Sequence, residues 1–176
     1  MTAAETIGEM FAGPGARDHL GEPVSIGEHM LQAGALAEAA GAEGGLVAAA
    51  LLHDIGHLLG EDEDEDEDRH GEAGANWLSQ WFGDAVTEPV RLHVAAKRYL
   101  CAVDAGYFGL LSAESVRTLS LQGGPMTTAE VAAFEALPFS GDAVAVRRWD
   151  DQAKDTMVTP PRFAHFAPLL EAFVRS

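Results

Sequence analysis

Hydrophobic and polar positions along the chain follow the spacing of helices. No run alternates with period two for long enough to predict a sheet. The pattern predicts an all-α fold, a single domain over residues 1–176 with no internal repeat. We expect helices over residues 25–41, 46–59, 70–83, 90–104, 112–121, 127–137, 141–155 and 161–174.

Local signals indicate where several of these helices begin and end. Ser25 followed by Glu28 is a capping-box pattern, and Gly41 is typical of a position just past a helix end. Pro89 is expected to precede the helix over 90–104. The segment 46–59 is apolar almost all round, which predicts a continuous, buried central helix.

Charge changes this picture at one place. The formal net charge is −17, and eight of the negative charges form the run Glu61–Asp68, leaving −9 on the rest of the chain. Like charges repel, so residues 61–68 are expected to be a solvated loop inserted in the fold, with metal recruitment as a less favoured alternative. An acidic chain is expected to repel nucleic acid and anionic membranes. A small anionic substrate remains compatible with a local pocket of bases and metal.

Other compositional features narrow the class of protein. The one cysteine, Cys101, excludes an internal disulfide and a thiolate metal cluster. The first residues are acidic and lack the basic start of a secretory signal, and no apolar run reaches the length of a membrane span. These features favour a cytoplasmic protein. They leave the oligomeric state open.

The sequence HDIGH at residues 53–57 places His and Asp next to each other. A charged Asp54 in an apolar helix needs a partner, which is either a metal or a buried Asp–His hydrogen bond. Histidines on four separate predicted helices favour metal, because with two aspartates they supply six nitrogen and oxygen ligands. The candidate ligands are His29, His53, Asp54, His70, His93 and Asp150.

Basic residues accompany these candidate ligands at helical spacing. Lys97 follows His93 by one turn, so both face the same way. Arg147, Asp150 and Lys154 are spaced by three and four and are expected on one face of a helix. The alternative is that these bases are surface charges paired with nearby acids such as Asp151.

The motifs resemble a known family. The pattern of His29, then His53-Asp54, then a late Asp150 is similar to the HD-domain superfamily, whose members are all-helical and are mostly metal-dependent phosphohydrolases. The stretches GEPVSIGEHMLQ, AALLHDIGH, HGEAGANWL, HVAAKRYL, SLQGGPM and RRWDDQAK more closely resemble the mixed-valent diiron oxygenases that act on 1-hydroxy-2-aminoethylphosphonates, related in site design to myo-inositol oxygenase.

This resemblance implies a fold, a cofactor and a reaction. The fold would be a single HD-domain helical bundle, and the cofactor two iron ions as an Fe(II)/Fe(III) pair. The partners would be a small organophosphonate and O2. The C–P bond would be cleaved to give inorganic phosphate and glycine or glycine betaine.

The resemblance also implies roles for individual residues. The six candidate ligands would bind iron, with Asp54 bridging and Asp150 preferred to Asp151, and Asp54, His57 and Lys97 would be catalytic. Substrate would be bound by a larger set, in which a protonated His57, Lys97 and Arg147 hold the phosphonate, Ser115 and Ser120 are weaker hydroxyl donors, and Glu22 faces the amine. Lys154 completes that set together with His19, which stands where the family has a gating tyrosine three residues before Glu22.

Two other functions stay open from the sequence. A metal-dependent phosphohydrolase of a phosphate ester or nucleotide would use the same bases. A non-catalytic metal-binding or sensor domain is the third reading. The amine of an oxygenase substrate could be primary or trimethylated, and a trimethylammonium favours an aromatic cage. Tyr99, Tyr107, Phe108 and Trp149 are the available aromatic residues.

Overall fold

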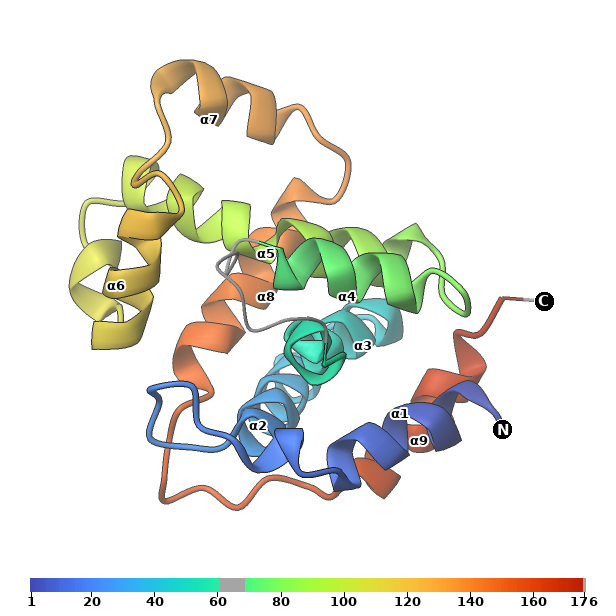
Figure 1. Cartoon of the computed structure of the whole chain (residues 1–176). Coiled ribbons are helices and arrows are strands. Elements are labelled where there is room, and N and C mark those ends of the chain that lie inside the picture. Colours follow the sequence, from blue (N-terminus) through green and yellow to red (C-terminus); the bar gives the residue numbers. More distant parts are fainter. Residues whose placement is uncertain (61–68, 176) are drawn as a thin grey trace.

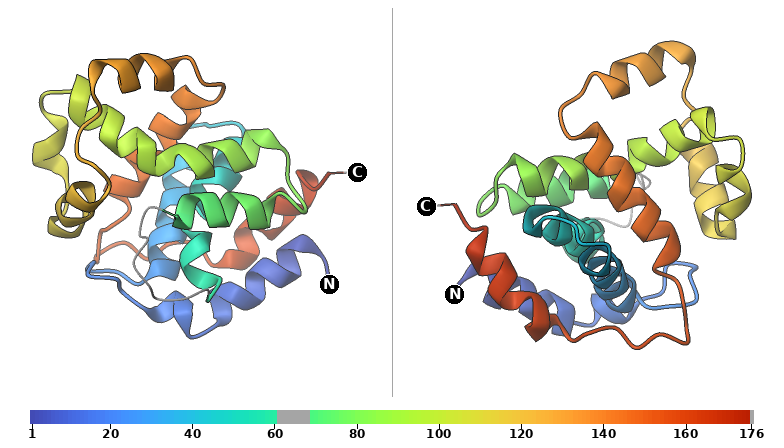
Figure 2. Two further views of the ribbon diagram at one scale, coloured as in Figure 1. Left: turned by 45° about the horizontal axis from the view of Figure 1, so that its top comes forward. Right: turned by 180° about the vertical axis from the view of Figure 1, so that it is seen from behind.

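The helices form one bundle around a buried central helix (Figures 1 and 2). The computed structural model describes residues 1–60 and 69–175, so the predicted acidic loop at 61–68 lies outside the described residues. Within the described residues the regular elements are helices, and none is a strand. The α-helices are α1 Ala3–Ala12, α2 Ile26–Ala39, α3 Gly44–Leu52, α4 His70–Leu78, α5 Asp84–Val103, α6 Ala113–Leu121, α7 Thr128–Glu135, α8 Ser140–Gln152 and α9 Phe163–Ala172.

Short 3-10 helices connect these elements where the structure describes the chain: η1 Gly15–Arg17, η2 Ile55–Leu58 and η3 Tyr107–Leu110. The all-α prediction is confirmed. No helix in the described part of the chain is long and apolar enough to cross a membrane.

Helix α3 lies at the centre of the core. Its residues from Val47 to Leu52 are at most 2% exposed, because the helix packs against α2, α5, α8 and α9. Burial of a leucine or valine side chain contributes about 1.5–3 kcal/mol, so this apolar helix holds the bundle together. Helices α1 and α9 lie side by side and carry both termini, whereas α6 and α7 lie at the other end of the bundle (Figure 1).

Several predicted boundaries were wrong. The helix expected over 46–59 ends at Leu52 and continues after a break as η2. Helix α4 ends at Leu78 rather than near residue 83. Pro89 lies inside α5, which begins at Asp84, so the proline does not mark its start. Proline removes one backbone donor, and the burial of Val86, Pro89 and Val90 compensates for that loss.

One helix was not predicted. Helix α1 begins after Thr2, whose side chain accepts a hydrogen bond from the Glu5 amide while the Glu5 side chain bonds the Thr2 amide. This capping box satisfies two backbone donors that would otherwise have no partner within the helix. Helix α1 then buries Ile7 against the main core.

Candidate active site

The HD dipeptide lies at a break in the chain rather than inside a helix. Helix α3 ends at Leu52, and Asp54 adopts φ −101° and ψ 12°, outside the helical region. The Nδ1 atom of His53 lies 2.8 Å from the Ala50 carbonyl oxygen. The break lets the adjacent side chains of His53 and Asp54 meet, with 3.3 Å between His53 Nε2 and Asp54 Oδ2.

Gly56, in the same motif, allows a close approach of helix α4. A Cβ atom at Gly56 would lie only 2.1 Å from the carbonyl oxygen of His70, the first residue of α4. Only glycine fits this contact, because any other residue would force the two backbones apart. The close approach places His70 Nε2 3.3 Å from Asp54 Oδ1.

The Asp54 carboxylate lies between two pairs of histidines. Its Oδ2 atom is 3.4 Å from His29 Nε2 and 3.3 Å from His53 Nε2. Its Oδ1 atom is 3.3 Å from His70 Nε2 and 3.4 Å from His93 Nε2. Within each pair, the two Nε2 atoms are 3.0 Å apart. The carboxylate therefore has one oxygen for each of two neighbouring positions.

Asp150 completes the first of these positions, and Asp151 does not. Asp150 comes from helix α8, and its Oδ1 atom lies 3.2 Å from His29 Nε2. The Asp151 carboxylate instead accepts hydrogen bonds from Tyr107 and Arg147. The described residues thus contain two metal-competent groups, one of His29, His53 and Asp150 and one of Asp54, His70 and His93.

Hydrogen bonding orients the imidazole rings toward these positions. The Nδ1 atoms of His29, His53 and His93 lie 2.7–2.9 Å from backbone carbonyls, which only accept, so each Nδ1 carries the proton. Their Nε2 atoms therefore point inward with lone pairs available for a metal. This arrangement is typical of histidine ligands held by surrounding groups.

The pKa values of the clustered histidines are also compatible with a bound metal cation. Burial opposes a charge on His29, but Asp150 and Asp54 raise its pKa to about 10. Burial lowers the pKa of His93 to about 4, with a smaller contribution from His70. Without metal, a proton on His29 therefore balances the buried carboxylates. A divalent metal would replace that proton, since two ligands at adjacent positions about 2.1 Å from a metal lie about 3 Å apart.

Two buried cations, Lys97 and Arg147, lie near the metal-competent groups. Lys97 is 2% exposed, and its Nζ atom donates a hydrogen bond to Thr118 Oγ1 at 2.8 Å. Burial, and then the charge of Arg147, lowers the pKa of Lys97 to about 8. Arg147 bonds the Tyr107 hydroxyl through Nε at 3.1 Å and Asp150 through Nη1 at 2.7 Å. Arg147 thus connects the candidate ligand Asp150 to the Tyr107 hydroxyl.

Two of the predicted substrate residues, Arg147 and Lys154, donate to the hydroxyl group of Ser115 in α6. Arg147 Nη2 and Lys154 Nζ each lie 3.3 Å from Ser115 Oγ. Lys154 Nζ also bonds Glu22 Oε1 at 2.7 Å. The prediction that Lys154 shares a helical face with Arg147 was wrong, because α8 ends at Gln152. Lys154 lies beyond the helix, and its side chain still reaches Ser115.

Two predictions for this pocket were wrong. Ser120 is exposed, and its hydroxyl contacts the Val116 carbonyl at 3.5 Å on the outer side of α6. His57 stacks on His70 with ring centroids 4.2 Å apart, but it is not protonated at neutral pH. Burial, and then the charge of His70, lowers the pKa of His57 to about 4. His57 can therefore accept a hydrogen bond, but it adds no positive charge.

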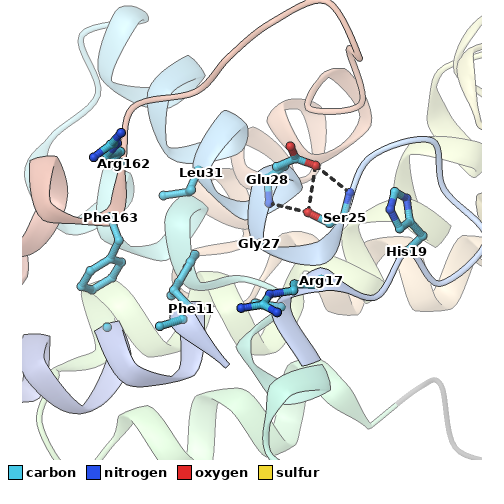
Figure 3. Close-up of a pocket in the computed structure, with 12 residues that line it drawn as sticks. Phe11, Arg17, His19, Ser25, Gly27, Glu28, Leu31, Arg162 and Phe163 are labelled. Atoms are coloured by element: carbon cyan, nitrogen blue, oxygen red, sulfur yellow. Dashed lines mark hydrogen bonds between the residues drawn. The ribbon is translucent and has the colours of Figure 1, made fainter. Parts of the chain in front are cut away.

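His19 lies at the surface rather than over the cluster. Its Nδ1 atom is 3.2 Å from the Glu22 carbonyl oxygen, and its ring is exposed. Together with Phe11, Arg17 and Phe163 it lines a shallow groove of about 570 Å³ (Figure 3). None of the metal-competent residues lines this groove. The structure therefore does not bring His19 to a gating position above the metal-competent groups.

Three hydroxyl groups in the pocket were not predicted from the sequence. Thr118 bonds Lys97, Ser112 bonds Glu22 at 2.7 Å, and the Tyr107 hydroxyl lies between Arg147 and Asp151. Ser112, Ser115 and Thr118 are spaced by three, so one face of the helix predicted over 112–121 carries hydroxyl groups. That spacing was the available signal. Tyr107 gives no comparable signal in the sequence.

Comparison with known proteins agrees with the geometry of the site. The family model described as HD domain matches residues 26–121. The [1-hydroxy-2-(trimethylamino)ethyl]phosphonate dioxygenase (glycine-betaine-forming) of Leisingera caerulea is 46% identical over 97% of this chain and 89% of its own length. The hydroxymethylphosphonate dioxygenase of Gimesia maris is 53% identical over 76% of this chain and 69% of its own length. The chain therefore belongs to the HD-domain family and, within it, to the phosphonate dioxygenases.

Proposed function

We propose that the protein uses O2 to cleave the C–P bond of a 1-hydroxyphosphonate that carries an amino or trimethylamino group on C2. The C–P bond breaks, C1 is oxidised to a carboxylate, and phosphorus leaves as inorganic phosphate. One O2 supplies the two oxygen atoms that are gained, and one proton is released. The products are phosphate and either glycine or glycine betaine. The observation that carries this proposal is the Asp54 carboxylate between two histidine pairs, with the buried cations Lys97 and Arg147 in the same region of the core.

We infer that the metal is a pair of iron ions in the mixed-valent Fe(II)/Fe(III) state. His29, His53 and Asp150 would hold one ion, His70 and His93 the other, and Asp54 would bridge them. Neutral imidazoles and carboxylates suit iron as well as other first-row metals, so the donor set fits. When bound, such a pair supplies the redox chemistry that a reaction with O2 needs.

The remaining roles belong to the side chains of the pocket. Lys97 and Arg147 oppose the two negative charges of the phosphonate, and a buried location strengthens both attractions. Ser115 donates its hydroxyl to the same group. The neutral His57 accepts a hydrogen bond from the C1 hydroxyl or from a protonated phosphonate oxygen. Glu22 faces the ammonium end of the substrate.

Oxygen uptake tests this proposal against hydrolysis. Iron-loaded protein is mixed with 1-hydroxy-2-aminoethylphosphonate in an oxygen electrode, and phosphate is measured in the same sample. The proposal predicts one O2 consumed for each phosphate released. Phosphate released from ordinary phosphate esters without oxygen uptake would favour a metal-dependent phosphohydrolase, for which the same groups would activate water.

A further inference from the structure

The Lys154 ammonium group fills a subsite that contains three acceptors. Its Nζ atom lies 2.7 Å from Glu22 Oε1 and 3.3 Å from the hydroxyl oxygens of both Ser112 and Ser115. Ser112 also donates its hydroxyl to Glu22 at 2.7 Å. The side chains of Lys154 and Glu22 are 14% and 17% exposed. An ammonium has three N–H donors, so each donor of Lys154 has an acceptor within this subsite.

The pairing matters because Glu22 is the carboxylate expected to face the substrate's amine. A mostly buried carboxylate without a counter-ion is costly. A site that depends on the substrate to supply the missing partner therefore rejects an analogue that lacks it, by factors of about 10⁴ in favourable cases. Glu22 does not depend on the substrate in this way, because Lys154 already neutralises it.

We propose that Lys154 is a specificity-determining residue, the internal counter-ion of Glu22, and that it lets the pocket take 1-hydroxyphosphonates with no amino group. This inference rests on the proposed function and widens its substrate class to 1-hydroxyphosphonates without an amine. A substrate without an amine leaves the Glu22–Lys154 pair intact. A substrate with an amine must displace the Lys154 ammonium from Glu22 before its own ammonium can bind there.

Three of the aromatic residues considered for a trimethylated amine are engaged elsewhere in the fold. A trimethylammonium cannot donate hydrogen bonds and is bound best by aromatic faces. The ring of Tyr99 packs against Phe134 at 4.9 Å, and the ring of Tyr107 faces the Arg148 guanidinium at 6.0 Å. Trp149 packs against the main core, so these three rings already have partners. The polar subsite around Glu22 suits an ammonium with N–H groups, such as that of Lys154.

The test compares three phosphonates in the full-length, iron-loaded protein. They are hydroxymethylphosphonate, 1-hydroxy-2-aminoethylphosphonate and its N-trimethyl analogue. Affinities are measured anaerobically by calorimetry, where no turnover occurs, and kcat/KM is measured with O2. The wild type is expected to bind and cleave hydroxymethylphosphonate at least as well as the two amine-bearing compounds.

Variants at Lys154 then measure the effect of its charge on substrate preference. Lys154→Met leaves Glu22 without its counter-ion, so kcat/KM for hydroxymethylphosphonate should fall at least tenfold relative to that for the amino compound. Lys154→Arg keeps the charge and should restore the wild-type ratio. Arg148→Met removes a charge from the exposed side of helix α8, which ends just before Lys154, and serves as the matched control.

Two outcomes would overturn the inference while leaving the proposed function standing. One is a wild type that cleaves the amino compound and neither binds nor cleaves hydroxymethylphosphonate. The other is an equal loss for all three compounds in Lys154→Met, which would assign Lys154 to the phosphonate alone. If no phosphonate is cleaved, the proposed function fails, and the anaerobic affinities still decide whether Lys154 sets the preference.

Discussion

A Cβ atom on Gly56 would lie 2.1 Å from the carbonyl oxygen of His70, so the two backbones touch where the HD motif meets helix α4. This contact determines where His70 stands relative to Asp54. It connects a feature of the backbone to the second metal-competent group, which also contains His93.

Gly56→Ala should therefore displace His70 and weaken the second metal position. The side chain must push away backbone rather than a flexible side chain, so we expect the iron content to fall from two ions per chain toward one. Elemental analysis after gel filtration measures this. Gly141→Ala is the control, since nothing lies within 4 Å of its Cβ position in α8. Two iron ions retained in Gly56→Ala would contradict the importance of the contact.

Asp54→Asn should lose metal because the amide cannot offer one anionic oxygen to each histidine pair. We expect less than one iron per chain and no turnover. Asp150→Asn should lose the metal at His29 and His53, whereas Asp151→Asn should keep both ions, since Asp151 bonds Tyr107 and Arg147 instead. Iron content and circular dichroism of the three variants separate metal loss from unfolding. Loss of metal in Asp151→Asn alone would reverse the assignment of the aspartates.

Deprotonation of Lys97 should lower kcat/KM at high pH. Burial holds the pKa of this lysine at about 8, so its ammonium is mostly charged at pH 7 and is lost as the pH rises through 8. In the proposed function the charged form binds the phosphonate dianion, so kcat/KM should fall about tenfold per pH unit well above pH 8. Lys97→Arg keeps its charge and should move this decrease to higher pH, whereas Lys97→Met should raise KM and leave the iron content unchanged. A wild-type profile that stays flat to pH 10 would exclude Lys97 as the phosphonate partner.

Tyr107→Phe should raise KM while both iron ions remain. The change removes the hydroxyl that bonds Arg147 and leaves part of the Asp151 carboxylate without a donor, which costs about 1–3 kcal/mol. Thermal unfolding and kinetics measure the two effects. Tyr99→Phe is the matched control, because that hydroxyl bonds Glu135 at the surface and should change neither quantity. An unchanged KM in Tyr107→Phe would show that Arg147 is positioned without it.

The clustering of the candidate ligands could be predicted from the sequence, because buried histidine and aspartate side chains need a partner, either a metal or each other. His29, His53, His70 and His93 come from different parts of the chain and meet as expected. The break after Leu52 could not be predicted, since the apolar pattern continues through it. The pairing of Glu22 with Lys154 joins residues that are distant in the sequence, and local patterns carry no signal for such a contact.

It was also harder to predict which residues of one helix face the candidate site and which face solvent than to predict the buried core. Ser115 and Ser120 both lie in α6, and only the docking of that helix decides that Ser115 faces Arg147 and Ser120 faces solvent. The position of His19 depends on a turn in which Leu20 and Gly21 have φ of 44° and 79°. Leucine gives no local signal for such a conformation.

Phosphorus NMR shows directly whether the protein cleaves a C–P bond and whether that cleavage requires oxygen. Iron-loaded protein is incubated with 1-hydroxy-2-aminoethylphosphonate, with its N-trimethyl analogue and with ordinary phosphate esters, each with and without O2. We expect a phosphate signal from a phosphonate only when O2 is present. Phosphate from the esters under anaerobic conditions, with no change in either phosphonate, would contradict it.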